Sequence, residues 1–600
     1  GKALARSALV ASLYARPKEI KNPAATAKTL AQITGEPSKE LLSKLKSSKP
    51  FVFLKREIDP KQQKKIEALR LPGIGFENEF RRFYPYRDMA AHLLGFVKVD
   101  EVGMSGLELT YNKVISGEPG RVSWLVDAHG KSYQREQQLP LPGATITTTI
   151  DSPIQHIVQK ELRAAAEKTQ AAGISIVVMD PNSGAILAMA NSPSFNPNAY
   201  GRFPESSYSL NPSVALTYEP GSTFKMVTIA AALEEGLTTP EERIFCENGA
   251  IYIGKRKIDD HDPYGYLTVA EIMQNSSNVG TIKLGQRVGP ARLKYYVERY
   301  GFGQKTSIDL PAEAPGQVPR GDWSQSTLAS VSIGHEISVT PLQTATIVST
   351  IANGGIRYKP YVVQKIDDPR LGITEVKPGG TRVMAEKTAL EVRWMLEDVV
   401  TDGTAKTSRL TGYRAAGKTG TAQKFDSENG GYFSSKYVSS FAGFVPVSNP
   451  KFTIVVVIDD PKGRYYGGEV AAPVFKRIAE QVLRNKSIAP DDPDYQPKRY
   501  TESPERKQQQ PSSPLSPKKP EVRVLDVTTR SGQSGSGFEF GEIVVPDFTG
   551  LSIRQVMDES SKLGLEHRIS GFGQVISQKP LPGSVVRPGT RIQFTLSLNN

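Results

Sequence analysis

The stretch EPGSTFKM, residues Glu219–Met226, decides how the rest of the chain is interpreted. Its proline and glycine are turn residues, and the run after them is apolar nearly all round, as in a helix buried inside a domain. The spacing places Ser222 at the start of this helix and Lys225 one turn later on the same face. Burial and the positive end of the helix dipole both favour a neutral lysine amine, which can accept the serine's proton. The stretch therefore predicts an activated serine nucleophile.

Two further motifs follow in the chain. Ser276-Ser277-Asn278 comes after a helical stretch, so that a hydroxyl and an amide are presented from a loop. Lys418-Thr419-Gly420-Thr421 precedes strand-like sequence, and a strand edge of small residues offers main-chain N–H donors to a substrate. A Ser-x-x-Lys motif alone arises by chance, and three decoy copies lie in surface-like or linker sequence. The three motifs together, in this order, form a known serine acyl-transfer signature.

A nucleotide-binding site is the main competing interpretation. The segment from Gly412 to Thr419 satisfies the phosphate-loop pattern G-x-x-x-x-G-K-[ST]. That loop needs a buried strand before its first glycine and a helix after its lysine, whereas the preceding sequence is polar and Gly420 breaks a helix start. Asp259–Asp262 could bind a metal ion but is better interpreted as a polar loop, and His335 lacks a second histidine four residues on. We expect neither a metal nor a cofactor.

Composition limits the class of protein. A chain of 600 residues requires two to four domains, and 38% hydrophobic with 23% charged residues is typical of globular proteins. One cysteine excludes an intramolecular disulfide framework. The net charge of +13 favours anionic partners such as phospholipid or cell-wall polymer, while no nucleic-acid module is recognisable. No apolar run is long enough to span a membrane.

The pattern along the chain predicts four parts. Residues 1–145 mix short strands and helices, and 146–485 have strands near both ends with helices between them, which predicts an antiparallel sheet covered by helices. The first strand of this second part is expected at Ala144–Ile150. Residues 486–541 are rich in Pro, Gly and Ser and are expected to form a disordered linker. Residues 542–600 predict a small α+β module with a helix at Ser552–Leu563.

From about Phe51 to Ile478 the chain resembles the class B penicillin-binding proteins, the membrane-anchored transpeptidases that cross-link peptidoglycan. Besides the three motifs, the likeness includes Arg82-Phe83-Tyr84-Pro85, Gly106-Leu107-Glu108 and Ala471-Ala472-Pro473-Val474-Phe475. Val545-Pro546-Asp547-Phe548 and the later Pro-Gly pairs resemble a PASTA domain. The resemblance implies a multidomain α/β protein: an N-terminal α+β pedestal of the dimerisation type, a penicillin-recognising transpeptidase domain and a small α+β PASTA domain. The form of the first motif resembles the cell-division, FtsI-like branch more than the elongation branch.

The resemblance also implies a mechanism and a setting. Ser222 is expected to attack the bond between two terminal D-alanines of a donor stem peptide, with Lys225 as base, Ser276 as proton relay and Asn278 holding the donor's amide. Lys418, Thr419, Gly420 and Thr421 are expected to bind the terminal carboxylate and the oxyanion. A β-lactam would acylate the same serine. The implied location is the outer face of the cytoplasmic membrane, through a single upstream helix, with a SEDS-type glycan polymerase and divisome membrane proteins as partners.

Three rival functions remain at this stage. A β-lactamase shares the fold, but we find no Glu-x-x-Leu-Asn element that would activate water, and residues 1–145 would be superfluous. A D,D-carboxypeptidase is chemically adjacent and has the same motifs. A wall-binding scaffold with a vestigial catalytic domain is the non-enzymatic alternative, and the intact Ser222, Lys225 and Lys418 argue against it.

Overall fold

The computed structural model describes residues 2–98, 100–126, 132–426, 430–494, 543–551, 553–571, 574–587 and 590–597. The chain divides into two compact units, Gly1–Tyr500 and Thr501–Asn600. Nearly all of the predicted linker, from 495 to 541, lies outside the described residues. Within the described residues, none of the helices combines the length and apolarity needed to cross a membrane.

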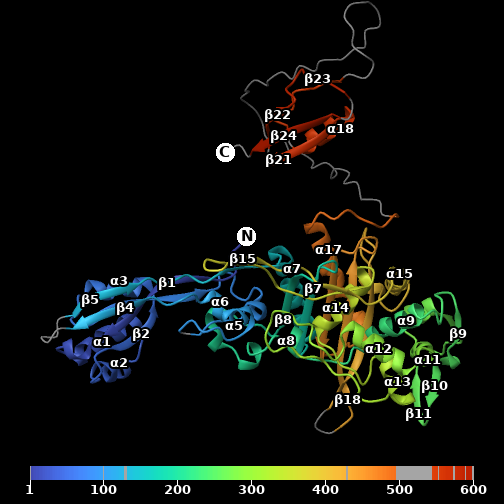
Figure 1. The fold of residues 1–600 in the computed structure, drawn as a ribbon, viewed down its shortest axis with the longest axis horizontal. Coiled ribbons are helices and arrows are strands. Elements are labelled where there is room, and N and C mark those ends of the chain that lie inside the picture. Colours follow the sequence, from blue (N-terminus) through green and yellow to red (C-terminus); the bar gives the residue numbers. More distant parts are fainter. Residues whose placement is uncertain are drawn as a thin grey trace, which may run out of the picture. The chain divides into compact units, whose positions relative to one another are not determined.

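The N-terminal region, blue in Figure 1, is built on an antiparallel sheet. Its strand order is β2-β1-β3. Its strands are β1 (Arg6–Ala15), β2 (Val52–Ile58) and β3 (Ile74–Phe83), and its helices are α1 (Pro23–Thr34), α2 (Ser38–Leu45) and α3 (Pro60–Ala68). Leu13, Leu30 and Leu41 form part of one buried cluster between them. A hairpin of β4 (Arg121–Val126) and β5 (Ser132–Gln138) and the short helices α4 (Ala91–Leu94), α5 (Gly106–Thr110) and α6 (Asn112–Ile115) complete the region.

A five-stranded antiparallel sheet forms the centre of the first unit, in the order β17-β18-β19-β7-β8. The strands are β7 (Gly173–Met179), β8 (Ile186–Ser192), β17 (Ala416–Phe425), β18 (Tyr432–Val445) and β19 (Phe452–Asp459). Strands from the two ends of the region therefore share one sheet, as predicted. The strand expected at Ala144–Ile150 is β6 (Thr145–Thr148), which pairs with β14 (Val363–Asp368) in a separate three-stranded sheet with β15 (Gly372–Glu375).

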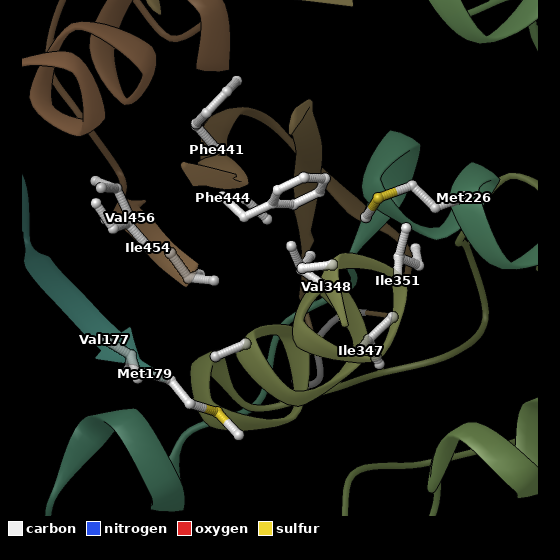
Figure 2. Close-up of a cluster of buried hydrophobic side chains, with 14 of the residues drawn as sticks. Val177, Met179, Met226, Ile347, Val348, Ile351, Phe441, Phe444, Ile454 and Val456 are labelled. Atoms are coloured by element: carbon white, nitrogen blue, oxygen red, sulfur yellow. The ribbon is translucent and has the colours of Figure 1, made fainter. Parts of the chain in front are cut away.

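Helices cover both faces of the central sheet. On one face, Phe441 of β18 packs against Phe475 of α17 (Ala472–Asn485), with ring centroids 4.6 Å apart. Phe444, three residues further along the same strand, points to the opposite face and lies near Val348 of α14 (Pro341–Ala352) in Figure 2. Every residue of α14 is buried, so this helix forms the centre of the core. The helix α7 (Ser152–Thr169) packs against α17 and against β7 and β8.

The segment between β8 and β17 is mainly helical. Its longer helices pack around α9 (Lys225–Glu234), which is buried along nearly its whole length. The other helices of this segment are α8 (Pro212–Ala215), α10 (Val269–Asn275), α11 (Asn278–Val288), α12 (Pro290–Tyr300), α13 (Gln325–Ser332) and α15 (Glu386–Thr401). The short helix α16 (Gly467–Val470) follows β19. Three small pairs complete it: β9 (Arg243–Phe245) with β12 (Tyr266–Thr268), β10 (Ala250–Ile253) with β11 (Arg256–Asp259), and β13 (Ile356–Tyr358) with β16 (Gly380–Arg382).

The C-terminal unit has its own small core. The sheet order is β21-β24-β22, with β21 (Glu566–Gly571) parallel to β24 (Arg591–Ser597) and β22 (Gln574–Lys579) antiparallel to it. The predicted helix appears as α18 (Ile553–Lys562), and β20 (Ile543–Val544) pairs with β23 (Val585–Val586). Phe548 and Phe594 pack edge to face at 5.0 Å between their centroids. These aromatic rings explain how so short a module closes a core of its own.

Candidate active site

Ser222 lies in a single 3-10 turn, Gly221–Phe224, which runs directly into α9 at Lys225. The α-helix therefore begins three residues later than predicted, while the serine still stands one turn before the lysine. Gly221 has a φ of 51°, a conformation that glycine adopts without strain. Its N–H donates to the carbonyl oxygen of Gly334, at 3.1 Å. The Ser222 side chain is half-buried, and its hydroxyl forms no hydrogen bond with Lys225 within the described residues.

Lys225 joins the first motif to the second. Its Nζ donates hydrogen bonds to the Ser276 hydroxyl, at 3.2 Å, and to the Ser276 backbone oxygen. Ser276 can face the lysine because it ends α10 in a left-handed conformation, with a φ of 59°. Lys225 is fully buried, and this burial lowers its pKa to about 7. The amine is therefore available in its neutral form near neutral pH.

Asp260 holds the second motif in place. Its carboxylate accepts hydrogen bonds from the Ser277 hydroxyl, at 2.6 Å, and from the backbone N–H groups of Asn278 and Val279 at the start of α11. The Asn278 side chain donates to the Asp259 backbone oxygen at 2.7 Å. A carboxylate at a helix N-terminus satisfies N–H groups that have no partner inside the helix. Sequence reasoning treated this stretch as a polar loop and missed its role as an anchor for Ser277 and Asn278.

The third motif lies on β17, the edge strand of the central sheet, and packs against the serine turn. A Cβ atom on Gly420 would lie 2.3 Å from Ser440 Oγ and 3.0 Å from the Pro220 carbonyl oxygen, so a side chain has no room here. Thr421 Oγ1 accepts a hydrogen bond from the Gly467 N–H at 3.0 Å, and this bond does not use the hydroxyl's own hydrogen. The glycine thus lets the strand approach Ser222 closely.

A hydroxyl and an amine of β17 complete the third motif. The hydroxyls of Thr419 and Thr404 are hydrogen-bonded at 3.0 Å. Lys418 is fully buried, and its Nζ has no hydrogen-bond partner within the part of the chain that the structure describes. Burial and the charge of Lys225 lower the pKa of Lys418 well below its usual range. An unpaired amine held beside Lys225 is a prepared donor for an anionic ligand.

The competing phosphate-loop pattern does not have the structure that nucleotide binding requires. Lys418 stands inside a strand, not at the start of a helix, which rules out a phosphate loop at Gly412–Thr419. Within the described residues, His, Cys, Asp and Glu side chains form no group of three or more that could hold a metal ion. His335 instead contacts Glu219, with 3.0 Å between His335 Nδ1 and Glu219 Oε2, a pairing with no sequence signal.

Comparison with known proteins identifies the family. The family model "Penicillin binding protein transpeptidase domain" matches residues 174–480, the "Penicillin-binding Protein dimerisation domain" matches 1–148, and the "PASTA domain" matches 543–598. The chain belongs to the class B penicillin-binding proteins. The family, the fold class and the enzyme class that the resemblance implies are therefore confirmed.

Among the relatives of this penicillin-binding protein, peptidoglycan D,D-transpeptidase FtsI of Escherichia coli K12 is 35% identical, over 82% of this chain and 83% of that protein. Stage V sporulation protein D of Bacillus subtilis 168 is 33% identical, over 100% of this chain and 88% of that protein. A crystal structure of penicillin-binding protein 3 from Mycobacterium tuberculosis, complexed with ampicillin, has a TM-score of 0.64 and 34% identity, covering 70% of this chain and 92% of that one.

Proposed function

We propose that this penicillin-binding protein cross-links peptidoglycan stem peptides through an acyl-enzyme on Ser222, in the manner of the D,D-transpeptidases that it resembles. The observation that carries the proposal is the fully buried Lys225, whose pKa near 7 and contact with Ser276 make it a proton acceptor one turn from the serine. Burying a lysine amine costs folding free energy, and packing alone gives no reason to place one here. The family membership supplies the substrate class.

The proposed acylation step uses these groups in turn. Lys225 removes the proton of Ser222 Oγ as this oxygen attacks the carbonyl between two terminal D-alanines. The backbone N–H groups of Ser222 and Thr421 bind the oxyanion, and Ser276 passes the proton from Lys225 to the departing amine. The C–N bond breaks, a C–O bond to the serine remains, and D-alanine leaves.

The same side chains account for substrate binding. Asn278 holds the donor's amide, and the terminal carboxylate is bound by Lys418 and the hydroxyls of Thr419 and Thr421 on the strand containing Gly420. An amine from a neighbouring stem peptide then attacks the ester and regenerates the serine. A β-lactam imitates the terminal dipeptide and stays attached, and the relative from Mycobacterium tuberculosis was solved with ampicillin and with aztreonam.

We expect acylation to slow as the pH falls below about 7. Burial lowers the pKa of Lys225 to about 7, and only its neutral form can accept a proton. The second-order rate of labelling by a fluorescent penicillin should rise about tenfold per pH unit below pH 7 and level off above it. Labelling followed from about pH 5 to about pH 9, where the drug is intact, measures this profile. A flat profile would rule out Lys225 as the base.

We further propose the setting in which the enzyme acts. Residues 1–145 would form the pedestal, 146–485 the transpeptidase domain and 542–600 the PASTA domain, joined by a linker over 486–541. A membrane helix preceding Gly1 would hold the catalytic domain on the outer face of the cytoplasmic membrane. There a SEDS-type polymerase would supply glycan strands and divisome proteins would direct the enzyme to the septum. The support is the likeness to FtsI.

The transpeptidase proposal is tested by following both halves of the reaction. The full chain is incubated with a synthetic stem peptide ending in D-Ala-D-Ala and with an acceptor amine. D-alanine should be released together with a donor–acceptor amide product, and Ser222→Ala should abolish both. Release of D-alanine with water as the sole acceptor would indicate a carboxypeptidase instead. Hydrolysis of penicillin without a lasting adduct would indicate a β-lactamase.

Spore formation is a second candidate setting for the same chemistry. The alignment with the Bacillus subtilis sporulation protein covers this chain completely, including the PASTA domain, whereas the alignment with FtsI covers 82%. Depletion of the protein in its own bacterium separates the two settings. Filaments without septa would support the division role, and normal septa with defective spores would support the sporulation role.

A further inference from the structure

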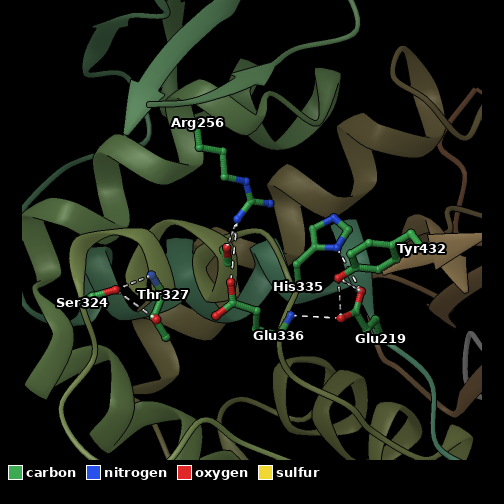
Figure 3. Close-up of polar contacts among 8 residues, drawn as sticks. Glu219, Arg256, Ser324, Thr327, His335, Glu336 and Tyr432 are labelled. Atoms are coloured by element: carbon green, nitrogen blue, oxygen red, sulfur yellow. Dashed lines mark hydrogen bonds and ion pairs between the residues drawn. The ribbon is translucent and has the colours of Figure 1, made fainter. Parts of the chain in front are cut away.

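The carboxylate of Glu219, three residues before Ser222, accepts hydrogen bonds from three residues of two other segments (Figure 3). The Tyr432 hydroxyl donates to both oxygens, at 3.0 and 3.2 Å. His335 Nδ1 lies 3.0 Å from Oε2, and the Glu336 N–H donates to Oε1 at 3.1 Å. The side chain of Glu219 is 16% exposed. Hydrogen bonds to a carboxylate that is largely shielded from water are stronger than those between neutral groups.

These bonds connect the serine turn to the strand that bears the third motif. Tyr432 is the first residue of β18 and pairs with Phe425 at the end of β17. The two rings pack edge to face, with 5.6 Å between centroids, and the ring of His335 also packs edge to face against Tyr432, at 6.2 Å. Burial and the charge of Glu219 raise the pKa of Tyr432, so the hydroxyl keeps its proton and remains a donor. Glu219 thus fixes the far end of β17 relative to Ser222.

The loop after α13 is held to the same turn twice. Besides the bonds from His335 and Glu336 to Glu219, the Gly334 carbonyl accepts the Gly221 N–H at 3.1 Å. A Cβ atom on Gly334 would lie 2.1 Å from the Gly221 carbonyl oxygen, so the two backbones are in direct contact. The turn that presents Ser222 is therefore fixed on one side by this loop and on the other by β17.

A weaker connection continues to the second motif. The Glu336 carboxylate lies 3.7 Å from Arg256 on β11, and Arg256 donates to Ser330 Oγ at 2.6 Å. The strand β11 leads directly into Asp260, the anchor of the second motif. The side chains of Arg256 and Glu336 are 46% and 40% exposed, so water screens this ion pair. Glu219, not Arg256, is thus the centre of the network.

We infer that Glu219 is a positioning residue for acylation, which holds the serine turn in register with β17 through Tyr432 and with the His335–Glu336 loop. This inference rests on the proposed acyl transfer at Ser222. Both oxygens of Glu219 already accept bonds from protein donors, which distinguishes it from a general base awaiting a proton. A small displacement of Ser222 relative to the oxyanion donors on β17 is enough to slow the reaction.

The test separates the saturating acylation rate from the half-saturating concentration of a fluorescent penicillin, using the full chain and stopped-flow mixing. Glu219→Ala should lower the saturating rate about 10- to 100-fold, because the serine turn loses its hydrogen bonds with His335, Glu336 and Tyr432. Glu219→Gln keeps an oxygen that can accept from Tyr432 and from the Glu336 N–H, and should stay within about fivefold of wild type. If the carboxylate were a base, the saturating rate of Glu219→Gln would fall as far as that of Glu219→Ala.

Tyr432→Phe provides a milder variant in case Glu219→Ala fails to fold, because it keeps the ring contacts and removes one donor. It should lower the saturating rate about threefold to tenfold. Tyr437→Phe is the matched control on the same strand, since the Tyr437 hydroxyl contacts Ser434, at 3.5 Å, and not Glu219. It should acylate as wild type does.

Two results would overturn the inference: a wild-type saturating rate in folded Glu219→Ala and Tyr432→Phe, or equal losses in Glu219→Gln and Glu219→Ala. Melting temperatures measured in parallel exclude unfolding as the cause of a lower rate. Failure of the underlying acyl transfer would be recognised differently, because wild type itself would then carry no label on Ser222.

Discussion

Replacing Lys225 by methionine is expected to lower the rate of acylation by about 100- to 10,000-fold, the range over which a positioned base contributes. Methionine has a similar length and fills the same buried space, but it cannot accept a proton from Ser222 or donate to Ser276. The measurement is the saturating rate of labelling by a fluorescent penicillin. The lysine is fully buried, and burying its amine costs folding free energy. Its replacement by methionine should therefore not lower the melting temperature by more than a few degrees.

Lys225→Arg is the control for charge. Arginine keeps the positive charge and the hydrogen-bond donors, but it does not lose its proton at any pH that a protein tolerates. It should therefore be about as slow as the methionine variant if Lys225 acts as a base. Rapid acylation by the arginine variant would show that a fixed charge suffices, and it would contradict the proposed proton transfer.

Replacing Lys418 by methionine is expected to have opposite effects on activity and on stability. Its buried amine has no hydrogen-bond partner within the described residues, and removing such a group should stabilise the fold by about 1–3 kcal/mol. Acylation should fall about 10- to 100-fold, because the variant loses a charge-assisted bond to the substrate carboxylate. Thermal unfolding and labelling rates measure the two effects on one preparation.

The stability gain of Lys418→Met should depend on pH. Burial and the charge of Lys225 lower the pKa of Lys418 in the folded chain, so the unfolded chain binds the extra proton and the wild type is destabilised at neutral pH. The wild type recovers this stability as the pH rises toward the lysine pKa of the unfolded chain, about 10.4. The difference between variant and wild type should therefore shrink at high pH. A variant less stable than wild type at pH 7 would contradict this account.

The role of Lys418 also depends on what occupies the site. In the empty site, burial and the charge of Lys225 lower the pKa of its amine and so favour the neutral form. A substrate carboxylate brings an opposite charge, which favours the protonated amine. Binding of an anionic substrate should therefore take up a proton at Lys418, while Lys225 stays neutral and able to accept one.

The sequence was sufficient to predict the features that depend on local pattern. The apolar run after Ser222 predicted a buried helix, and the small residues around Gly420 predicted a strand that another backbone can approach. Both predictions hold, because burial periodicity and glycine's lack of a side chain act within a few residues. The strand expected at Ala144–Ile150 forms at Thr145–Thr148, but its pairing with β14 was not predictable, since alternation does not identify a strand's partner.

Contacts between distant residues were not predictable. Asp260 caps α11 across a gap of 18 residues, and nothing in its polar neighbourhood distinguishes it from Asp259 or Asp262. Glu219 meets His335 from 116 residues away. Such pairs depend on how the helices pack around α9, and a single sequence carries no signal for them. The hydrogen bond from Lys225 to Ser276 was likewise not predicted, since the resemblance implied only that Ser276 relays a proton.

The most direct test of the central claim is to map the covalent adduct. The full chain and its Ser222→Ala variant are incubated with a fluorescent penicillin, digested with a protease, and the labelled peptide is identified by mass spectrometry. The account predicts one adduct, on the peptide that contains Ser222, and no adduct in the variant. An adduct at another residue, or none in folded wild type, would contradict it.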